Sequence, residues 1–565
     1  MMCGEVRRLL FWLAVLSPLS AQERWSRVRS GPFEVLSRAG ERAAQETLGI
    51  LDQFRYIFGR ELSREDPRTV WPVRVLLVRR GRDAEPAYPP ALGRDSFVAS
   101  LQADVHPTPQ WLRVLARILL EANTRPMPRD LEEGLLDFYA QVRIEGNRLR
   151  LGMPPPSPTI GWGLVHMLSL HPDYRGKLRP LLYNLQQGLD PEPAWRNATG
   201  KRPEQVREEA SQWLAQGRLA EETISGRVLD PRTDFRVETA DPPAGEIALA
   251  DLRLAQGRLA EAARLYEAVL ARHDGSAEAR EGLALTALAA GDAAAARRHS
   301  ETAIAKGSSN ARVWVEAARA ETDATKAVAM LRKAAALNPN WAEPLRLLAE
   351  RLSDPRLRLE ALGAAAKLAP RDAGLWRTLA EAQEQAGDYR AAARSWMAAE
   401  QASLEEAERA RIREIRRTLD ARRLEAEAAA RRREAEEKER ELARLKEEAL
   451  RRIREAEARA NRDAGPPPAN VVPWFETERP PGRVQGKLRQ VDCLRGVARL
   501  LIETADGKQT RLAVRDPSRV VVLGGGKLEL TCGPQKAPRT VIIEFHPRQD
   551  AALGTAGEVA TVEYR

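Results

Sequence analysis

The sequence predicts a multidomain, predominantly α-helical protein that ends in a small all-β domain, and three observations support this. The chain has 565 residues, 30% of them charged and 5% aromatic, which is too long for one compact core. A helical pattern with a period of 34 residues recurs between residues 243 and 406. Short runs of β-type residues separated by turn residues fill residues 483–565.

The N-terminus has the order of a secretory signal peptide. Arg7 and Arg8 precede the apolar run LLFWLAVL, and the small residue Ala21 closes the segment before a polar stretch. Residues 1–21 are therefore expected to be cleaved near Ala21 and the rest exported, to the periplasm or outside the cell. An uncleaved anchor is the alternative. No later segment approaches the roughly 20 apolar residues of a membrane helix.

Residues 22–217 are predicted to form an α+β domain. GPFEVLSRAG and the following ERAAQETLGILDQFRYIFGREL fit a short strand and an amphipathic helix. VWPVRVLLV and DSFVASLQADV fit two further strands. A helix pair then follows, Trp111 to Asn123 and Leu131 to Val142, joined by the turn RPMPRD.

This order of elements, with LEEGLLDFY on the second helix of the pair and GWGLVHMLSLHPDYRGKLRP after it, resembles the peptidase MA-like domain, a gluzincin metalloprotease fold. Such enzymes carry His-Glu-x-x-His on the first helix, which holds Zn²⁺ and activates water, and a third ligand, Glu, on the second. The resemblance puts Glu133 at the third-ligand position. The first-helix motif then falls on Arg113, Val114 and Arg117.

These residues cannot hold the metal. A guanidinium stays protonated and offers no lone pair, and valine cannot act as a base. No histidine lies between Pro107 and Val165 to restore the motif in another register. We therefore expect no catalytic residue, no metal and no cofactor, and hypothesise that Arg117 or Arg113 contacts the Glu133 carboxylate where a metal once did. The alternative is that Glu133 is an ordinary surface residue.

Residues 218–242 are expected to be a linker, and residues 243–406 about five helical hairpins. Gly257, Gly291 and Gly387 mark equivalent turns, and the 96 residues between the last two equal one repeat of 34 and two of 31, so the middle repeats should have shortened first helices. The pattern resembles tetratricopeptide repeats, which implies a concave groove that binds a protein or peptide; a spacer without a ligand is the alternative. The packing positions of the resemblance are Ala262, Tyr266, Ala296, Trp376, Leu379, Ala392 and Trp396.

Residues 407–463 are predicted to form one long charged helix, because acids stand one turn before bases and neither Gly nor Pro occurs. Its apolar seam is thin, so we expect a self-supporting helix or weak coiled coil, with weak self-association left open. An extra bundle helix is the alternative. Residues 464–482 are rich in proline and are expected to be a stiff linker.

The β-rich end, residues 483–565, contains Cys493 and Cys532, which in an oxidising compartment are expected to form a disulfide; two separate thiols are the alternative. The net charge of the whole chain is +10, yet bases and acids are interleaved, so we expect no nucleic acid partner. The sequence as a whole predicts an exported, non-catalytic scaffold that binds proteins through its repeats and carries a pseudo-peptidase domain. The competing hypothesis is a zinc-independent or divergent peptidase of the cell envelope.

Overall fold

The structure is a computed structural model that describes residues 24–81, 85–217, 219–463, 482–523, 528 and 530–565. The expected signal peptide, residues 1–21, and all but the last residue of the expected linker 464–482 lie outside the described residues. The chain divides into two compact units, Met1–Glu437 and Lys438–Arg565, and each is described by itself. Within the described residues no helix is both long enough and apolar enough to cross a membrane.

The first unit is built around a six-stranded mixed sheet with the order β4-β5-β3-β2-β1-β9. Its central strands β2, β3 and β5 are parallel, and the outer pairings are antiparallel. Helix α1 (Glu41–Glu61) provides the crossover that two neighbouring parallel strands require, between β2 and β3. The strands are β1 (Ser26–Ser30), β2 (Phe33–Ser37), β3 (Val73–Val78), β4 (Tyr88–Leu92), β5 (Phe97–Gln102) and β9 (Val237–Thr239).

The two faces of this sheet bury different helices. Val35 and Val75 point to the side where Phe54 and Phe58 of α1 pack, together with α2 (Pro109–Asn123). The alternate residues Leu36, Leu76 and Val98 point the other way, as the two-residue period of a strand requires. They pack on α9 (Pro242–Ala255), which is the first helix of the repeat array.

A helical half follows the sheet. Helices α3 and α4 approach so closely that a Cβ added to Gly134 would lie 2.1 Å from the carbonyl oxygen of Gly161, so both glycines are needed for this contact. A small sheet of order β6-β7-β8 lies beside them. The elements are α3 (Arg129–Ala140), β6 (Arg143–Glu145), β7 (Arg148–Leu151), α4 (Ile160–Leu170), α5 (Leu178–Gln186), α6 (Pro191–Thr199), α7 (Pro203–Ala215), β8 (Glu222–Ser225) and α8 (Pro231–Asp234).

The segment expected to be a linker, residues 218–242, differs from that expectation. Its described part contributes β8, which pairs with β7, and β9, which pairs with β1 at the edge of the main sheet. Both strands have four residues or fewer, too few to show a two-residue hydrophobic period in the sequence. The segment is therefore part of the N-terminal domain, which extends to the start of α9.

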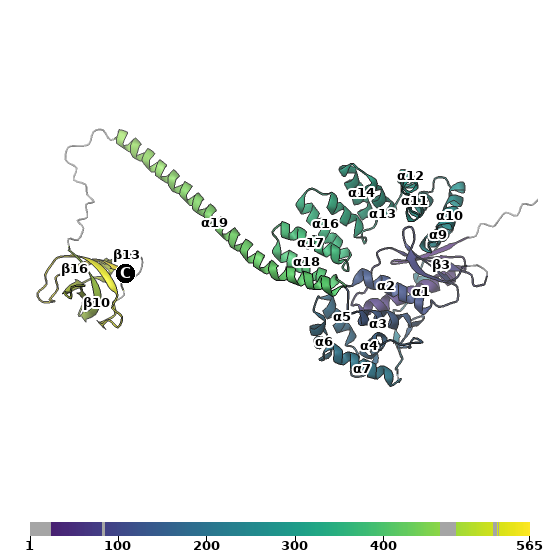
Figure 1. Ribbon diagram of the computed structural model, residues 1–565, viewed down its shortest axis with the longest axis horizontal. Coiled ribbons are helices and arrows are strands. Elements are labelled where there is room, and N and C mark those ends of the chain that lie inside the picture. The colour runs from purple at the N-terminus through teal and green to yellow at the C-terminus, as the bar shows by residue number, and fades with distance from the viewer. Residues whose placement is uncertain (1–23, 82–84, 218, 464–481, 524–527, 529) are drawn as a thin grey trace, which may run out of the picture. The chain divides into compact units, whose positions relative to one another are not determined.

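Five helical hairpins form the repeat array, drawn in teal and green in Figure 1. The first helices of the third and fourth hairpins, α13 and α15, have 10 and 9 residues, whereas α11 and α17 have 13. The prediction that these two first helices are shortened is confirmed. The remaining helices are α10 (Leu259–Arg272), α11 (Ala277–Ala289), α12 (Ala293–Ala305), α13 (Ala311–Ala320), α14 (Ala324–Leu337), α15 (Glu343–Arg351), α16 (Pro355–Leu368), α17 (Ala373–Gln385) and α18 (Tyr389–Ala402).

Two kinds of turn join the helices inside a hairpin. Gly257, Gly291 and Gly387 have φ values of +72°, +81° and +77°, a region that side chains rarely adopt, so glycine is required there. The shortened hairpins lack such a glycine. Asp323 and Asp354 instead cap α14 and α16 by accepting hydrogen bonds from backbone N–H groups of the first turn.

Helix α19 (Glu406–Asp463) has 58 residues, or about 87 Å at 1.5 Å per residue. Near its start, Ile412 and Leu419 are buried against Trp396 of the last hairpin. Farther along, Leu442, Leu445 and Ile453 are each slightly more than half exposed. The expected long charged helix is thus present from residue 406 to residue 463.

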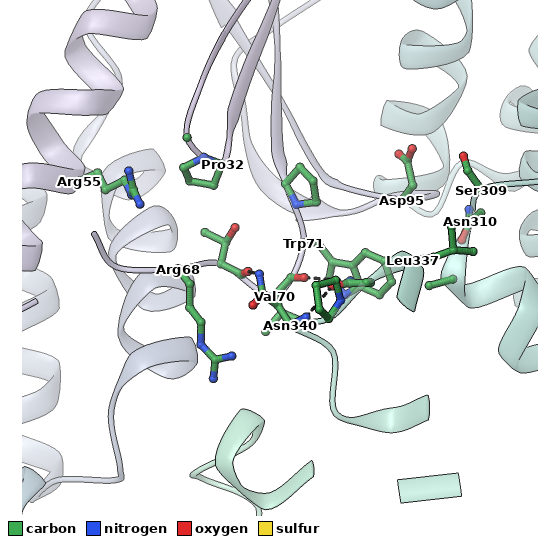
Figure 2. A pocket seen from close by; sticks show the side chains of 16 residues that line it. Pro32, Arg55, Arg68, Val70, Trp71, Asp95, Ser309, Asn310, Leu337 and Asn340 are labelled. Atoms are coloured by element: carbon green, nitrogen blue, oxygen red, sulfur yellow. Dashed lines mark hydrogen bonds between the residues drawn. The ribbon is translucent and has the colours of Figure 1, made fainter. Parts of the chain in front are cut away.

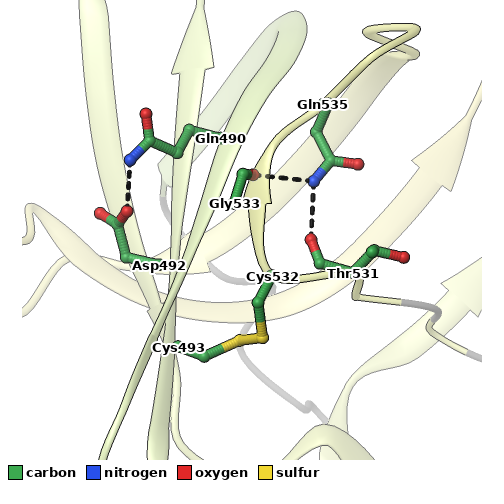
Figure 3. The surroundings of a disulfide bond; sticks show 7 residues. All are labelled: Gln490, Asp492, Cys493, Thr531, Cys532, Gly533 and Gln535. Atoms are coloured by element: carbon green, nitrogen blue, oxygen red, sulfur yellow. Dashed lines mark hydrogen bonds between the residues drawn. A yellow bond between two sulfur atoms is a disulfide. The ribbon is translucent and has the colours of Figure 1, made fainter.

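The second unit contains a closed five-stranded barrel. Strand β10 (Gly482–Leu494) pairs with both β11 and β15, and the barrel continues β11-β12-β16-β15, with β12 and β16 parallel. This is the strand arrangement of an OB-type barrel. Cys493, near the end of β10, is disulfide-bonded to Cys532, with the two Cα atoms 5.6 Å apart (Figure 3). The other elements are β11 (Val497–Glu503), β12 (Gln509–Val514), a 3₁₀ turn (Pro517–Arg519), β13 (Val521–Leu523), β14 (Gly533–Pro534), β15 (Thr540–His546) and β16 (Gly557–Tyr564).

Candidate functional site

The residues at the expected peptidase position form a ladder of ion pairs between α2 and α3. Arg113 and Arg117 lie one turn apart on α2, and Glu133 and Asp137 lie one turn apart on α3. Arg113 donates to both carboxylates, with 2.6 Å between its Nε and Oδ1 of Asp137. Arg117 donates to Oε1 and Oε2 of Glu133, at 3.1 and 3.2 Å. The hypothesised contact between Glu133 and an arginine is therefore present, and both arginines make it. We call these four residues the arginine ladder.

The ladder is partly open to solvent. The side chains of Arg113, Arg117 and Glu133 are 34%, 35% and 35% exposed. Partial burial by itself would raise the pKa of Glu133, but hydrogen bonds from Arg117 and Arg113 outweigh it and hold that pKa below its usual value. Glu133 is thus an anion with its charge already neutralised. Val114, half-buried in the same turn of α2, adds no polar group.

Metal ligands are not gathered at the ladder. Among the described residues, no group of three or more His, Cys, Asp or Glu side chains is placed to hold a metal ion. The buried histidine of the helical half, His166, accepts a hydrogen bond at Nδ1 from Trp213 and has Nε2 2.9 Å from the carbonyl oxygen of Ala220. Both of its ring nitrogens are therefore engaged in structural contacts.

The packing residues predicted for the repeats lie between helices. Ala262, Tyr266 and Ala392 are fully buried, and Leu379, Trp396 and Ala296 are less than a tenth exposed. Trp376 is half-buried and donates from Nε1 to the carbonyl oxygen of Pro370 at 3.2 Å. The sequence pattern did not reveal Gly282, where an added Cβ would lie 2.2 Å from the Tyr266 ring.

The inter-repeat loops of the array lie against the N-terminal domain (Figure 2). Asn338 and Asn340, between α14 and α15, donate hydrogen bonds to the carbonyl oxygens of Val70 and Thr69, at 3.0 and 3.3 Å. Trp71 packs against Trp341 with ring centroids 4.9 Å apart. These contacts border a cavity of about 470 Å³, whose walls come from residues 68–72 on one side and from the loops before α13 and α15 on the other.

A buried ion cluster fixes the first two hairpins in the same way. Arg94, from the turn between β4 and β5, contacts Asp251 of α9 and Glu281 of α11. Tyr266 donates a 2.6 Å hydrogen bond to the same Asp251 carboxylate. The sequence alone gives no signal for this cluster, because a charged residue on a helix is normally expected to be exposed. The first helices of two hairpins are consequently covered by the N-terminal domain, and this part of the expected groove is not open.

A cavity of about 1050 Å³ lies at the other end of the array. Its walls come from the turn before α3, the loop between α5 and α6, the end of α18 and the beginning of α19. Glu133 of the arginine ladder is one of its lining residues. Gln401 ties the walls together, because it donates to the carbonyl oxygen of Gly188 at 2.7 Å and accepts from Arg125 at 2.8 Å. We call this cavity the α18–α19 cleft.

Most acidic residues of the α18–α19 cleft are already paired with arginines. Arg413 and Arg416 of α19 both contact Glu400, and Arg409 contacts Glu406. On the other wall, Arg371 contacts Glu132 at 2.8 Å, and Arg207 contacts Asp130 outside the lining. The RPMPRD turn, which was expected only to connect two helices, contributes Arg125 and Arg129 to the lining of this cavity.

Comparisons with known proteins support the repeat array. Residues 253–318 match the family model described as tetratricopeptide repeat. No curated protein sequence matches the chain. Among solved structures, YrrB, described as a TPR protein with an unusual peptide-binding site, is similar at 16% identity over 30% of this chain and 92% of that chain, with a TM-score of 0.26. PilF of Pseudomonas aeruginosa (18%, 32% and 88%, TM-score 0.27) and MamA of Desulfovibrio magneticus (16%, 28% and 94%, TM-score 0.24) are also similar. The helical hairpins of residues 253–318 are thus of the tetratricopeptide type.

Proposed function

We propose that the protein is an exported, non-catalytic scaffold that binds other proteins, with a pseudo-peptidase domain at its N-terminus. The observation that carries the proposal is the arginine ladder. At the two helix positions where the family resemblance calls for zinc ligands, Arg113 and Arg117 donate to Glu133. A guanidinium supplies the positive charge of a metal ion but cannot activate water or polarise a carbonyl.

The repeat array supports the binding role. Each hairpin has an apolar stripe that only its neighbours can cover, so a stacked array exposes a long continuous surface suited to polypeptide ligands. Here the array also holds the N-terminal domain, through Arg94 and Trp71. Within the first unit, the N-terminal domain and the array would therefore present one continuous surface to a ligand.

An assay of the full-length mature chain tests the non-catalytic role. Purified protein is incubated with an unfolded protein substrate such as casein, with and without a chelator, and crosslinked in parallel to proteins of the producing cell. We expect no cleavage and reproducible capture of a small set of partners. Chelator-sensitive cleavage that is lost in Glu133→Gln would instead support a hydrolase.

Export is a separate part of the proposal. Residues 1–21 fused to a reporter that is active only outside the cytoplasm should give activity, and replacing Arg7 and Arg8 by acidic residues should abolish it. Reporter activity that does not depend on the segment would contradict export.

Weak self-association is a further component, located at α19. Leu442, Leu445 and Ile453 lie on one face of that helix and are about half exposed. Sedimentation of the full chain over a range of concentrations should show reversible dimerisation that weakens when these residues are replaced by serine. A concentration-independent monomer would exclude it.

A further inference from the structure

The rim of the α18–α19 cleft exposes large apolar side chains. Leu404 is 85% exposed, and Leu189 and Met397 are each 36% exposed, although they come from three separate elements of the chain. Scattered exposed apolar residues are ordinary on a protein surface, but their convergence around one cavity is typical of a binding site. An occupant of this cleft would bury them.

Two arginines of the cleft have no carboxylate partner. Among the described residues, no carboxylate forms an ion pair with Arg125 or Arg129. By contrast, Arg207 pairs with Asp130 and Arg371 pairs with Glu132. Arg125 is half-buried, and its guanidinium donates to the neutral side chain of Gln401 at 2.8 Å. Burial lowers the pKa of Arg125, so its position is unfavourable without an anion.

Arg129 is equally unfavourable where it stands. It is the first residue of α3, at the helix end whose partial positive charge repels a cation. Its side chain is exposed and contributes nothing to the core. The structure therefore gives no stabilising reason for an arginine here, whereas binding an anion would give one.

The two cleft acids without arginine partners do not cancel this positive charge. Asp190 is the N-cap residue of α6, and Glu204 lies in the first turn of α7. Both stand at the positive ends of helices, which neutralise part of their charge. On the opposite wall, Glu400 is shared by Arg413 and Arg416, and Arg413 also contacts Glu406, so the charges of that wall are paired with one another.

We propose that the α18–α19 cleft binds an extended peptide segment in which a carboxylate lies next to a large apolar side chain. The carboxylate is held by Arg125 and Arg129, and the apolar side chain packs on Met397 and Leu404. This inference rests on the proposed binding role and places its ligand between the N-terminal domain and the end of the array. Arg125 and Arg129, together with the exposed apolar rim, carry the inference, and the peptidase resemblance is not needed.

The test uses the full-length mature chain and three labelled probe peptides that alternate Leu with Glu, Gln or Lys, with glycine spacers. Fluorescence anisotropy should show the Glu probe binding at least about tenfold more tightly than the Gln probe, and the Lys probe not at all. Arg125→Gln and Arg129→Gln should each weaken binding of the Glu probe about tenfold, and Leu404→Ser about threefold. Arg356→Gln is the matched control, because Arg356 and its partner Glu360 are both exposed and both lie outside the cleft lining, so the substitution should have no effect.

Equal binding of the Glu and Gln probes, no binding of the Glu probe, or full binding by both arginine variants would overturn the inference. Arg129→Gln lies at an exposed position, so loss of folding does not confuse the result, and thermal unfolding of each variant verifies this. The outcome is distinguishable from failure of the proposed function, because chelator-sensitive proteolysis would refute the non-catalytic role whatever the probes do.

Discussion

Arg94 and Asp251 form an ion pair in the interior of the protein, with 3.2 Å between Nε and Oδ1, although 157 residues separate them in the chain. Arg94 belongs to the sheet of the N-terminal domain, and Asp251 belongs to the first helix of the repeat array. Their side chains are 5% and 0% exposed. Charges are buried at such depth only when each is paired, so the N-terminal domain and the array form one folding unit.

Replacing Arg94 by alanine tests this coupling. Glu281 would remain buried without its cation and Asp251 would keep only Arg74, so the free energy of unfolding should fall by about 3 to 5 kcal/mol. Urea unfolding followed by circular dichroism measures the change. The control Arg297→Ala removes an arginine from an exposed pair within α12 and should leave the urea midpoint nearly unchanged. A similarly small effect of Arg94→Ala would contradict the coupling.

Acid should destabilise the first unit through Glu34. Burial alone would raise the pKa of this carboxyl, but Arg74 and Arg29 outweigh burial and hold it below the ordinary value of 4.5. Because the folded pKa is depressed, the contribution of Glu34 is complete above about pH 4.5 and is lost as pH falls below it. The urea midpoint of wild type should therefore drop in acid.

Glu34→Gln should flatten that acid dependence, because the variant has no carboxyl to protonate. Asp251, whose pKa burial raises, acts in the opposite direction, so the difference between wild type and variant is the decisive quantity. Glu360→Gln, at an exposed pair, is the control. An unchanged acid slope in Glu34→Gln would show that other groups control acid unfolding.

Gly282→Ala should disrupt the first two hairpins. The added methyl group would lie 2.2 Å from the Tyr266 ring, and moving that ring would also disturb its hydrogen bond to Asp251. We expect a loss of about 1 to 3 kcal/mol in the free energy of unfolding, as is usual for overpacking. Gly275→Ala, with no atom within 4 Å of its new methyl group, should cost much less. Equal effects of the two substitutions would show that the helices can separate freely.

The fold was predictable wherever its pattern is local and periodic. The turn glycines and the shortened helices of the array could be predicted because the same repeat pattern occurs several times in the sequence. Strand β4, by contrast, was not predicted, because Pro89 and Pro90 lie within it and proline lacks a backbone N–H. It is an edge strand, where a missing backbone N–H is tolerated, and only the sheet order reveals this.

The candidate site was predictable only in part. The contact of Glu133 with Arg113 or Arg117 was expected because the resemblance to the peptidase MA-like domain places these residues at ligand positions on two neighbouring helices. The Arg94 cluster and the α18–α19 cleft unite residues more than 150 positions apart, and no pattern along the chain marks such pairs. Arg125 and Arg129 of the RPMPRD turn line a cavity because the end of the array lies beside them in the fold.

Restoring the zinc motif tests the proposed ancestry of the arginine ladder. In the triple variant Arg113→His, Val114→Glu, Arg117→His, two imidazoles one turn apart would face Glu133, which supplies a third ligand. We expect this variant to bind about one Zn²⁺ per chain, measured by calorimetry. The control triple variant Arg113→Asn, Val114→Gln, Arg117→Asn should bind none. Absence of zinc binding by the histidine variant would show that the two helices do not have the geometry of a peptidase site.

The zinc content of the purified wild-type mature chain tests the central claim most directly. Elemental mass spectrometry on protein prepared without chelator should give far less than one zinc per chain, because Arg113 and Arg117 occupy the place of ligands. One equivalent of zinc, lost together with stability when Glu133 is replaced by alanine, would contradict the account.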